Sequence, residues 1–258
     1  SESQMTKIFS NSALFYDAIY KNKEYQKEAA YVVESIRKLD STAKRMLELG
    51  CGTGNYSFIF RDHGFDVLGI DASEEMISLA NLKKSSLGHK HIDFEMCNSE
   101  DFHTNLEWDL AVSLFFMLGY QVSDTSLLET FQTVRSSLRT GGIFAFDFWY
   151  GPSVIKKGCT PNEIQIETSD HRMMRKSFPA ILAEENCLTI KQSYYIQDKK
   201  TEEYQNFDEV HKVRYFFENQ LSSFLEKSGF EVVKFEAFMG RETLQETDWA
   251  GMAFARAN

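Results

Sequence analysis

The sequence predicts an α/β protein: a mostly parallel sheet with helices on both faces, and an antiparallel β insertion after the fifth strand. Two observations predict this fold. Between residues 45 and 148, short apolar runs alternate with segments whose apolar residues recur at helical spacing, the pattern of repeated βαβ units. From residue 149 to 217, four stretches alternate apolar and polar residues without a helix between them, which indicates antiparallel strands.

The expected elements follow one another in a simple order. Two helices open the chain, at 12–20 and 24–39, because apolar residues recur there every three or four positions. The alternating region then contains a strand at 46–49, a helix at 56–62, a strand at 67–70, a helix at 73–84, strands at 92–96 and 110–116, a helix at 126–138 and a strand at 143–148. The insertion strands are expected at 163–168, 172–178, 188–197 and 207–217, and the chain closes with a helix at 219–227 and strands at 231–238 and 251–255.

Composition and charge narrow the classes of function. The 258 residues are 43% hydrophobic and 26% charged, which is ordinary globular usage. The net charge of -10 disfavours nucleic acid and anionic membrane surfaces as partners. No stretch approaches the roughly eighteen apolar residues of a membrane span, and residues 1–10 carry no basic segment followed by an apolar run.

The cysteines and histidines favour a metal-free protein of a reducing compartment. Cys51, Cys97, Cys159 and Cys187 are far apart and form no C-x-x-C pair, so we expect free thiols and a cytoplasmic location. The six histidines show no i, i+4 pair, so we expect no metal site.

One motif, a glycine-rich loop, indicates a ligand-binding site. Gly50, Gly52 and Gly54 follow the strand that holds Glu48, and such a loop lets backbone approach a ligand while the next helix offers its free N–H groups. The plainer alternative is a tight turn with no ligand, which a single glycine would fit. A dinucleotide fingerprint needs its third glycine at position 55, where Asn55 stands, and this counts against a Rossmann oxidoreductase.

A carboxylate on the next strand supports a nucleoside ligand. Asp71 ends that strand, 21 residues beyond Gly50, where it can accept hydrogen bonds from both ribose hydroxyls. The alternative for Asp71 is an acid at the start of the following helix.

The stretch 46–54, MLELGCGTG, resembles the first motif of the class I S-adenosylmethionine-dependent methyltransferases. The resemblance implies a Rossmann-like sheet and S-adenosylmethionine as cofactor. Asn98 stands where the family usually has an acid for the adenine amino group, and residues 108–116 resemble the segment that passes beneath the cofactor. The cofactor residues implied are Tyr25, Glu48, Gly50, Cys51, Gly52, Gly54, Asp71, Ala72, Met76, Asn98, Ser99 and Leu114.

A narrower resemblance runs along the chain. The segments 15–20, FYDAIY, and 23–25, KEY, resemble the N-methyltransferases that dimethylate amino groups on nucleotide-linked deoxysugars. Phe102, Ser113, Gly119 with Tyr120, residues 147–152, and His211 with Phe216 fall at the spacing of that branch. Some relatives have a histidine where Tyr120 stands.

This branch implies three segments and an acceptor site. Residues 1–148 would hold the N-terminal helices and the cofactor core, 149–217 the β insertion that covers the acceptor, and 218–258 the helix and strands that complete the core sheet. The arginines of the insertion suit a diphosphate, although they could equally be solvated strand-face charges. The acceptor residues expected are Tyr20, Trp149, Tyr150, Arg175, Arg214 and Arg241.

Methyl transfer needs little acid–base catalysis from the protein, because the leaving group of the cofactor is already activated. The candidate catalytic groups are Tyr16, which in this branch faces the sugar, Tyr120 and His211. A tyrosine can orient an amine, while a histidine can accept its proton. The plainer alternatives are a helix face packed on the core for Tyr16 and a partly buried strand residue for His211.

The sequence therefore predicts an S-adenosylmethionine-dependent methyltransferase whose partner is a small acceptor, with dTDP-linked or UDP-linked amino-deoxysugars favoured. Two alternatives stay open: another acceptor, such as an amino acid, a carboxylate or a phenol, and a non-catalytic cofactor-binding protein. A homodimer is compatible with the sequence.

Overall fold

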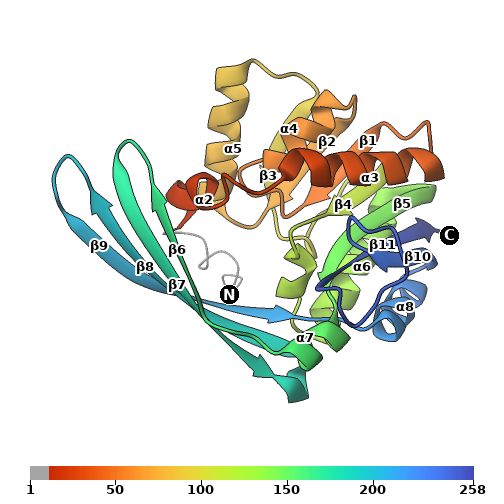
Figure 1. Cartoon of the computed structure of the whole chain (residues 1–258). Helices are drawn as coiled ribbons and strands as arrows, with labels where there is room; N and C mark the ends of the chain where they lie inside the picture. Colours follow the sequence, from red (N-terminus) through yellow and green to blue (C-terminus); the bar gives the residue numbers. More distant parts are fainter. Residues whose placement is uncertain (1–11) are drawn as a thin grey trace.

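The computed structural model describes residues 12–258, drawn in colour in Figure 1. The segment 1–10, in which we expect no export signal, lies outside the described residues. Within residues 12–258, no helix combines the length and the apolar character needed to cross a membrane.

The core of the molecule is a seven-stranded sheet with the order β10-β11-β5-β4-β1-β2-β3. Strands β1 to β5 run parallel to one another, whereas β11 is antiparallel to both β5 and β10. This arrangement confirms the predicted fold class. The strands are β1 Arg45–Leu49, β2 Asp66–Asp71, β3 Ile92–Met96, β4 Trp108–Ser113, β5 Leu138–Trp149, β10 Phe230–Ala237 and β11 Ala250–Ala257.

Helices cover both faces of this sheet (Figure 1). Helix α3 presents Val32 and Ile36 to one face, while α6 and α8 present residues such as Phe131 and Leu225 to the other. All four side chains are fully buried, and each contributes about 1.5 to 3 kcal/mol by leaving water. The helices are α2 Ala13–Ile19, α3 Tyr25–Leu39, α4 Asn55–Asp62, α5 Glu74–Leu87, α6 Asp124–Ser137 and α8 Glu218–Lys227.

A second, four-stranded antiparallel sheet extends away from the core (Figure 1). All four strands that the alternating pattern predicts are present, and two of them, β7 and β8, have twelve residues each. Along β9, Glu209 and His211 are buried while Asp208 and Val210 are exposed, so one face of the sheet turns inward. The strands are β6 Asn162–Glu167, β7 His171–Leu182, β8 Cys187–Asp198 and β9 Tyr204–Arg214.

The structure corrects two local predictions. Helix α7, Gly151–Lys157, follows β5 where we expect only strands, and Pro152 in its first turn is the signal for it. The strand expected at 110–116 ends at Ser113, because Phe115 and Phe116 adopt φ values of 65° and 60° in the left-handed region. A short 3₁₀ helix, η1, Met117–Tyr120, follows directly. The division of the chain into three segments stays a prediction.

Candidate active site

The glycine loop lies at the carboxyl ends of β1 and β2. Its glycines have φ values of 68° at Gly50, 54° at Gly52 and 83° at Gly54, a region that disfavours other residues. Asp71 ends β2 beside it, and its two carboxylate oxygens accept hydrogen bonds of 2.9 Å from the backbone N–H groups of Gly52 and Ser73. Burial raises the pKa of Asp71.

Open space lies next to this loop. A Cβ atom added at Gly52 would meet no atom within 4 Å, whereas one at Gly50 would lie 2.7 Å from the Met117 side chain. A loop with open space at Gly52 and the Asp71 carboxylate beside it fits the ribose end of a nucleoside cofactor. Twelve residues line the cavity: Tyr16, Tyr25, Gly50, Cys51, Gly52, Asn55, Tyr56, Asp71, Met76, Leu114, Phe115 and Met117.

Eight of these lining residues are expected from the sequence, and four are not. Asn55 and Tyr56 follow the loop directly, so their position beside the motif was a usable signal. Phe115 belongs to the segment 108–116, which resembles the one beneath the cofactor, but no sequence pattern marks the sharp turn after β4 that brings Phe115 and Met117 into the cavity.

Five other predicted cofactor residues do not line this cavity. Glu48 is 2% exposed and accepts a hydrogen bond from the Ser57 hydroxyl of α4, so it fastens the helix behind the loop. Burial raises the pKa of Glu48 to about 8. Gly54 is packed against Phe94. The remaining members are Ala72, Asn98 and Ser99, and the Asn98 amide donates to Asp101 at 2.9 Å.

The turn after β4 is held from the neighbouring strand. The carboxylate of Asp147, on β5, accepts hydrogen bonds from the backbone N–H groups of Phe115 at 2.9 Å and Phe116 at 2.8 Å. Asp147 is 2% exposed, and burial raises its pKa to about 7. Two consecutive non-glycine residues in the left-handed region store backbone strain, and this carboxylate offsets it.

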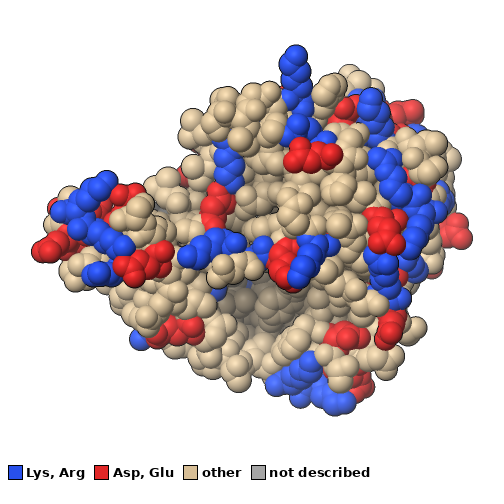
Figure 2. All heavy atoms as spheres, turned by 45° about the horizontal axis from the view of Figure 1, so that its top comes forward, with Lys and Arg blue, Asp and Glu red and all other residues tan. Residues whose placement is uncertain are grey.

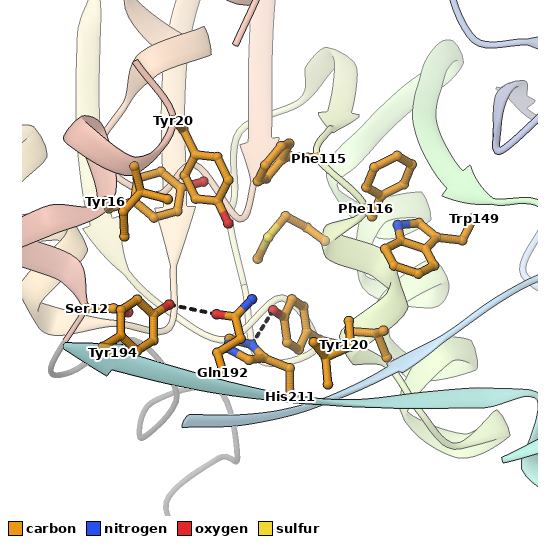
Figure 3. Close-up of a pocket in the computed structure, with 14 residues that line it drawn as sticks. Ser12, Tyr16, Tyr20, Phe115, Phe116, Tyr120, Trp149, Gln192, Tyr194 and His211 are labelled. Atoms are coloured by element: carbon orange, nitrogen blue, oxygen red, sulfur yellow. Dashed lines mark hydrogen bonds between the residues drawn. The ribbon is translucent and has the colours of Figure 1, made fainter. Parts of the chain in front are cut away.

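A second cavity, of about 220 Å³, lies between α2, the turn after β4, and the inner face of β8 and β9 (Figure 3). Tyr16, Phe115 and Met117 line both cavities and therefore stand at the boundary between them. Burial raises the pKa of Tyr16, which keeps its phenol protonated. The other lining residues are Ser12, Ile19, Tyr20, Phe116, Tyr120, Trp149, Ile190, Gln192, Tyr194, His211 and Val213.

The tertiary fold brings Tyr120 and His211 together although they are far apart in the sequence. The hydroxyl of Tyr120 lies 2.8 Å from Nδ1 of His211, and both side chains line the second cavity (Figure 3). Beside them, the Tyr194 hydroxyl donates to the Gln192 amide oxygen at 2.6 Å. Gln192 and Tyr194 alternate along β8, but the sequence alone does not tell which face of a strand turns inward.

A third cavity, of about 510 Å³, continues outward from the second, and the two share Phe116, Trp149, Ile190 and Gln192. Its cationic groups are Arg175 and Lys157, and Trp249 also lines it. Arg175 donates to the Tyr20 hydroxyl at 3.0 Å. Among the described residues, no carboxylate lies within ion-pair distance of Arg175.

Three predicted acceptor residues lie away from these cavities. Tyr150 belongs to the apolar core beside Phe148. Arg214 pairs with Asp124 at 2.8 Å, and Arg241 pairs with Glu34 of α3. Both arginines are thus paired with carboxylates outside the cavities, so the geometry does not favour their assignment to the acceptor.

The other basic residues of the insertion are mostly surface charges. Figure 2 shows basic and acidic side chains interspersed on the projecting end of the second sheet. Arg172, Lys176 and Lys191 pair with Glu167, Glu163 and Asp208 at distances of 2.8 to 3.7 Å. The plainer interpretation, solvated strand-face charges, therefore fits these three.

A glycine loop and an acidic strand end beside a cavity define the class: a protein of Rossmann-like fold with a site suited to a nucleoside cofactor. The family follows from comparison with known proteins. The family model described as a methyltransferase domain matches residues 40–216, and the chain belongs to this family.

Individual relatives agree with this assignment. The chain is 27% identical to YqeM of Bacillus subtilis (strain 168), which is named as a methyltransferase, over 87% of each chain. It is 22% identical to the dTDP-3-amino-3,4,6-trideoxy-alpha-D-glucopyranose N,N-dimethyltransferase of Streptomyces venezuelae, over 84% of this chain and 89% of the relative. An S-adenosylmethionine-dependent methyltransferase from Clostridium acetobutylicum ATCC 824 has the same fold, with a TM-score of 0.80, 19% identity, and 97% and 99% of the two chains covered.

The predicted enzyme class and cofactor are thereby confirmed: the protein is an S-adenosylmethionine-dependent methyltransferase. It resembles the nucleotide amino-sugar N,N-dimethyltransferases, as the sequence predicts.

Proposed function

We propose that this enzyme methylates the amino group of a deoxysugar linked to dTDP or UDP. The observation that carries the proposal is the series of three adjoining cavities: the glycine-loop cavity, the aromatic cavity of about 220 Å³, and the outer cavity with Arg175 and Lys157. An acceptor with a small amine end and a large anionic end would fit the last two. The name of the Streptomyces venezuelae relative supports the same class of substrate.

The residues of the first cavity are suited to hold the cofactor. Asp71 would accept the ribose hydroxyls, the open backbone at Gly52 would allow close approach, and Tyr25 lies at the same cavity. When bound, the cofactor supplies a methyl group on a sulfonium whose thioether leaves without protonation.

The chain's own contribution is to hold the amine in line with that methyl group. We propose that Tyr16, at the boundary of the first two cavities, and Tyr120 hydrogen-bond the amine, with His211 behind Tyr120. Alignment of this kind can contribute roughly 7 to 11 kcal/mol at best. The aromatic walls, Tyr20, Phe115 and Trp149, exclude water from the reacting centre.

The outer cavity would receive the nucleotide end of the acceptor. Arg175 is well suited to a diphosphate, because its guanidinium offers a planar fork of donors and has no carboxylate partner among the described residues. The hydrogen bond from Arg175 to the Tyr20 hydroxyl links the outer cavity to a wall of the aromatic cavity.

A panel of acceptors tests the proposal. Purified enzyme is incubated with S-adenosylmethionine and dTDP-linked or UDP-linked 3-amino and 4-amino deoxysugars, and products are read by mass shift. We expect a gain of one or two methyl masses on a nucleotide-linked amine and none on the free sugar. Methylation of an amino acid, a carboxylate or a phenol instead would identify another small acceptor, and no methylation of any nucleotide-linked amine would refute the proposed substrate class.

A further inference from the structure

A buried carboxylate lies behind the Tyr120–His211 pair. Glu209 and His211 are two residues apart on β9 and so point to the same inner face, and their exposed fractions are 6% and 4%. An oxygen of Glu209, Oε2, lies 3.7 Å from Nε2 of His211. The backbone N–H and hydroxyl of Ser12 donate to the two carboxylate oxygens at 3.2 and 2.9 Å.

This geometry favours one tautomer of the imidazole. At 3.7 Å this contact is longer than a hydrogen bond, so the carboxylate acts on the imidazole through its charge: it attracts a hydrogen on Nε2 and repels a lone pair there, in a site shielded from water. With its hydrogen on Nε2, His211 presents a lone pair at Nδ1. The Tyr120 hydroxyl, 2.8 Å away, then donates its hydrogen to Nδ1.

The tautomer of His211 decides whether the Tyr120 hydroxyl accepts or donates a hydrogen bond in the cavity. Burial raises the pKa of Tyr120, so its oxygen keeps its hydrogen. If that hydrogen is committed to His211, the oxygen faces the cavity as an acceptor. In the opposite tautomer, Nδ1 carries the hydrogen, and the Tyr120 hydrogen turns toward the cavity instead.

We propose that Glu209 is a positioning residue that sets the polarity of the Tyr120 hydroxyl, so that it accepts an N–H of the substrate amine. The inference rests on the proposed function, since an amine must be the acceptor. An amine that donates to Tyr120 keeps its lone pair for attack. A hydroxyl of opposite polarity would bind that same lone pair and oppose the transfer.

Glu209→Gln tests the assignment with little change of shape. The amide oxygen can still accept from Ser12, while the amide N–H₂ can face Nε2 and force its hydrogen onto Nδ1. The matched control is Asp208→Asn on the same strand, because Asp208 is exposed and pairs with Lys191 at 2.8 Å on the outer face.

Ring ¹⁵N spectra of His211 read the tautomer without any acceptor, and His211→Asn identifies the signal. We expect the hydrogen on Nε2 in the wild type and in Asp208→Asn, and on Nδ1 in Glu209→Gln. A wild-type ring with its hydrogen on Nδ1, or no change in Glu209→Gln, would overturn the proposal. This arm stands even if no amine acceptor is found, so it separates failure of the inference from failure of the proposed function.

Kinetics test the consequence. We expect Glu209→Gln to lower kcat by about ten-fold, the effect of roughly one hydrogen bond in the transition state, with cofactor KM unchanged. Because Glu209 acts through Tyr120, adding Glu209→Gln to Tyr120→Phe should cost nothing further. Losses that multiply in the double variant would show that Glu209 acts on the general structure and would refute the positioning role.

Discussion

The carboxylate of Asp71 accepts a 2.9 Å hydrogen bond from the backbone N–H of Gly52, which ties the end of one strand to the glycine loop of its neighbour. Parallel pairing of β1 with β2 brings the two residues together, because the carboxyl ends of parallel neighbours lie at the same edge. Loop shape and carboxylate position therefore depend on each other.

The first prediction concerns this pair. Asp71→Ala should weaken S-adenosylmethionine binding by roughly 1 to 3 kcal/mol through loss of charge-assisted hydrogen bonds, measured by calorimetry. Gly52→Val should abolish binding, because its side chain would fill the open space beside the loop. Gly64→Val is the control, since Gly64 also has a positive φ and open surroundings but lies outside the cavity. Equal losses in both glycine variants would attribute the effect to backbone strain alone.

The second prediction contrasts two arginines. Arg175→Ala should raise the acceptor KM far more than the cofactor KM, because Arg175 lines the outer cavity without a carboxylate partner among the described residues. Arg241→Ala should leave both constants unchanged, because Arg241 is paired with Glu34 away from the cavities. Steady-state kinetics with a nucleotide-linked amine decide this, and equal effects of the two substitutions would contradict the proposed anion site.

The third prediction concerns the reacting groups. Tyr16→Phe, Tyr120→Phe and His211→Asn should each lower kcat by at most about 10²-fold, the lower edge of what a general base contributes. The rate should rise with pH as the substrate ammonium loses its proton, and the midpoint should follow the pKa of the amine used. A midpoint that is the same for every amine, and disappears in His211→Asn, would identify His211 as a base.

A fourth prediction is the pH dependence that Glu48 adds to stability. Burial raises its pKa from an ordinary 4.5 to about 8, so the folded protein holds the proton more tightly than the unfolded chain. The contribution of Glu48 is therefore complete below about pH 4.5 and is lost as pH rises to about 8. In urea unfolding, wild type should lose about 1.4 kcal/mol per pH unit relative to Glu48→Gln across this window. Parallel stability curves would show that Glu48 is ionised when buried.

The fifth prediction addresses the turn after β4. Asp147→Asn leaves one acceptor oxygen for the two N–H groups of Phe115 and Phe116, so one buried donor loses its partner. We expect a loss of about 1 to 3 kcal/mol in the free energy of unfolding and a higher acceptor KM, since Phe115 and Phe116 line the aromatic cavity. An unchanged KM with reduced stability would limit Asp147 to a structural role.

The fold class was accessible from the sequence because it depends on local periodicity. Runs of apolar residues separated by helical segments predict a buried parallel sheet, and the alternation of apolar and polar residues in four stretches between 163 and 217 predicts antiparallel strands. The glycine loop and Asp71 were accessible for the same reason, since a βα turn and the next strand end must meet at one edge of such a sheet.

The acceptor side was only partly accessible. Tyr16, Tyr20, Trp149 and Arg175 were expected there from family resemblance, and the structure brings them to adjoining cavities. That they bind the acceptor stays a prediction. Gln192 and Tyr194 were missed, because alternation reveals two faces of β8 but not which one turns toward the core.

The sequence by itself determined the βαβ order, the glycine loop and the four insertion strands, all of which follow from patterns within short stretches, and the resemblance of its glycine motif to a known family implied the cofactor. Only the tertiary structure decided that Arg241 pairs with Glu34, that Phe115 and Phe116 turn back under Asp147, and that Glu209 lies behind His211. These relationships join residues distant in the chain or depend on which face of a strand is buried. Tertiary packing decides which distant residues pair and which face of a strand is buried, because local periodicity fits either face and any partner equally well.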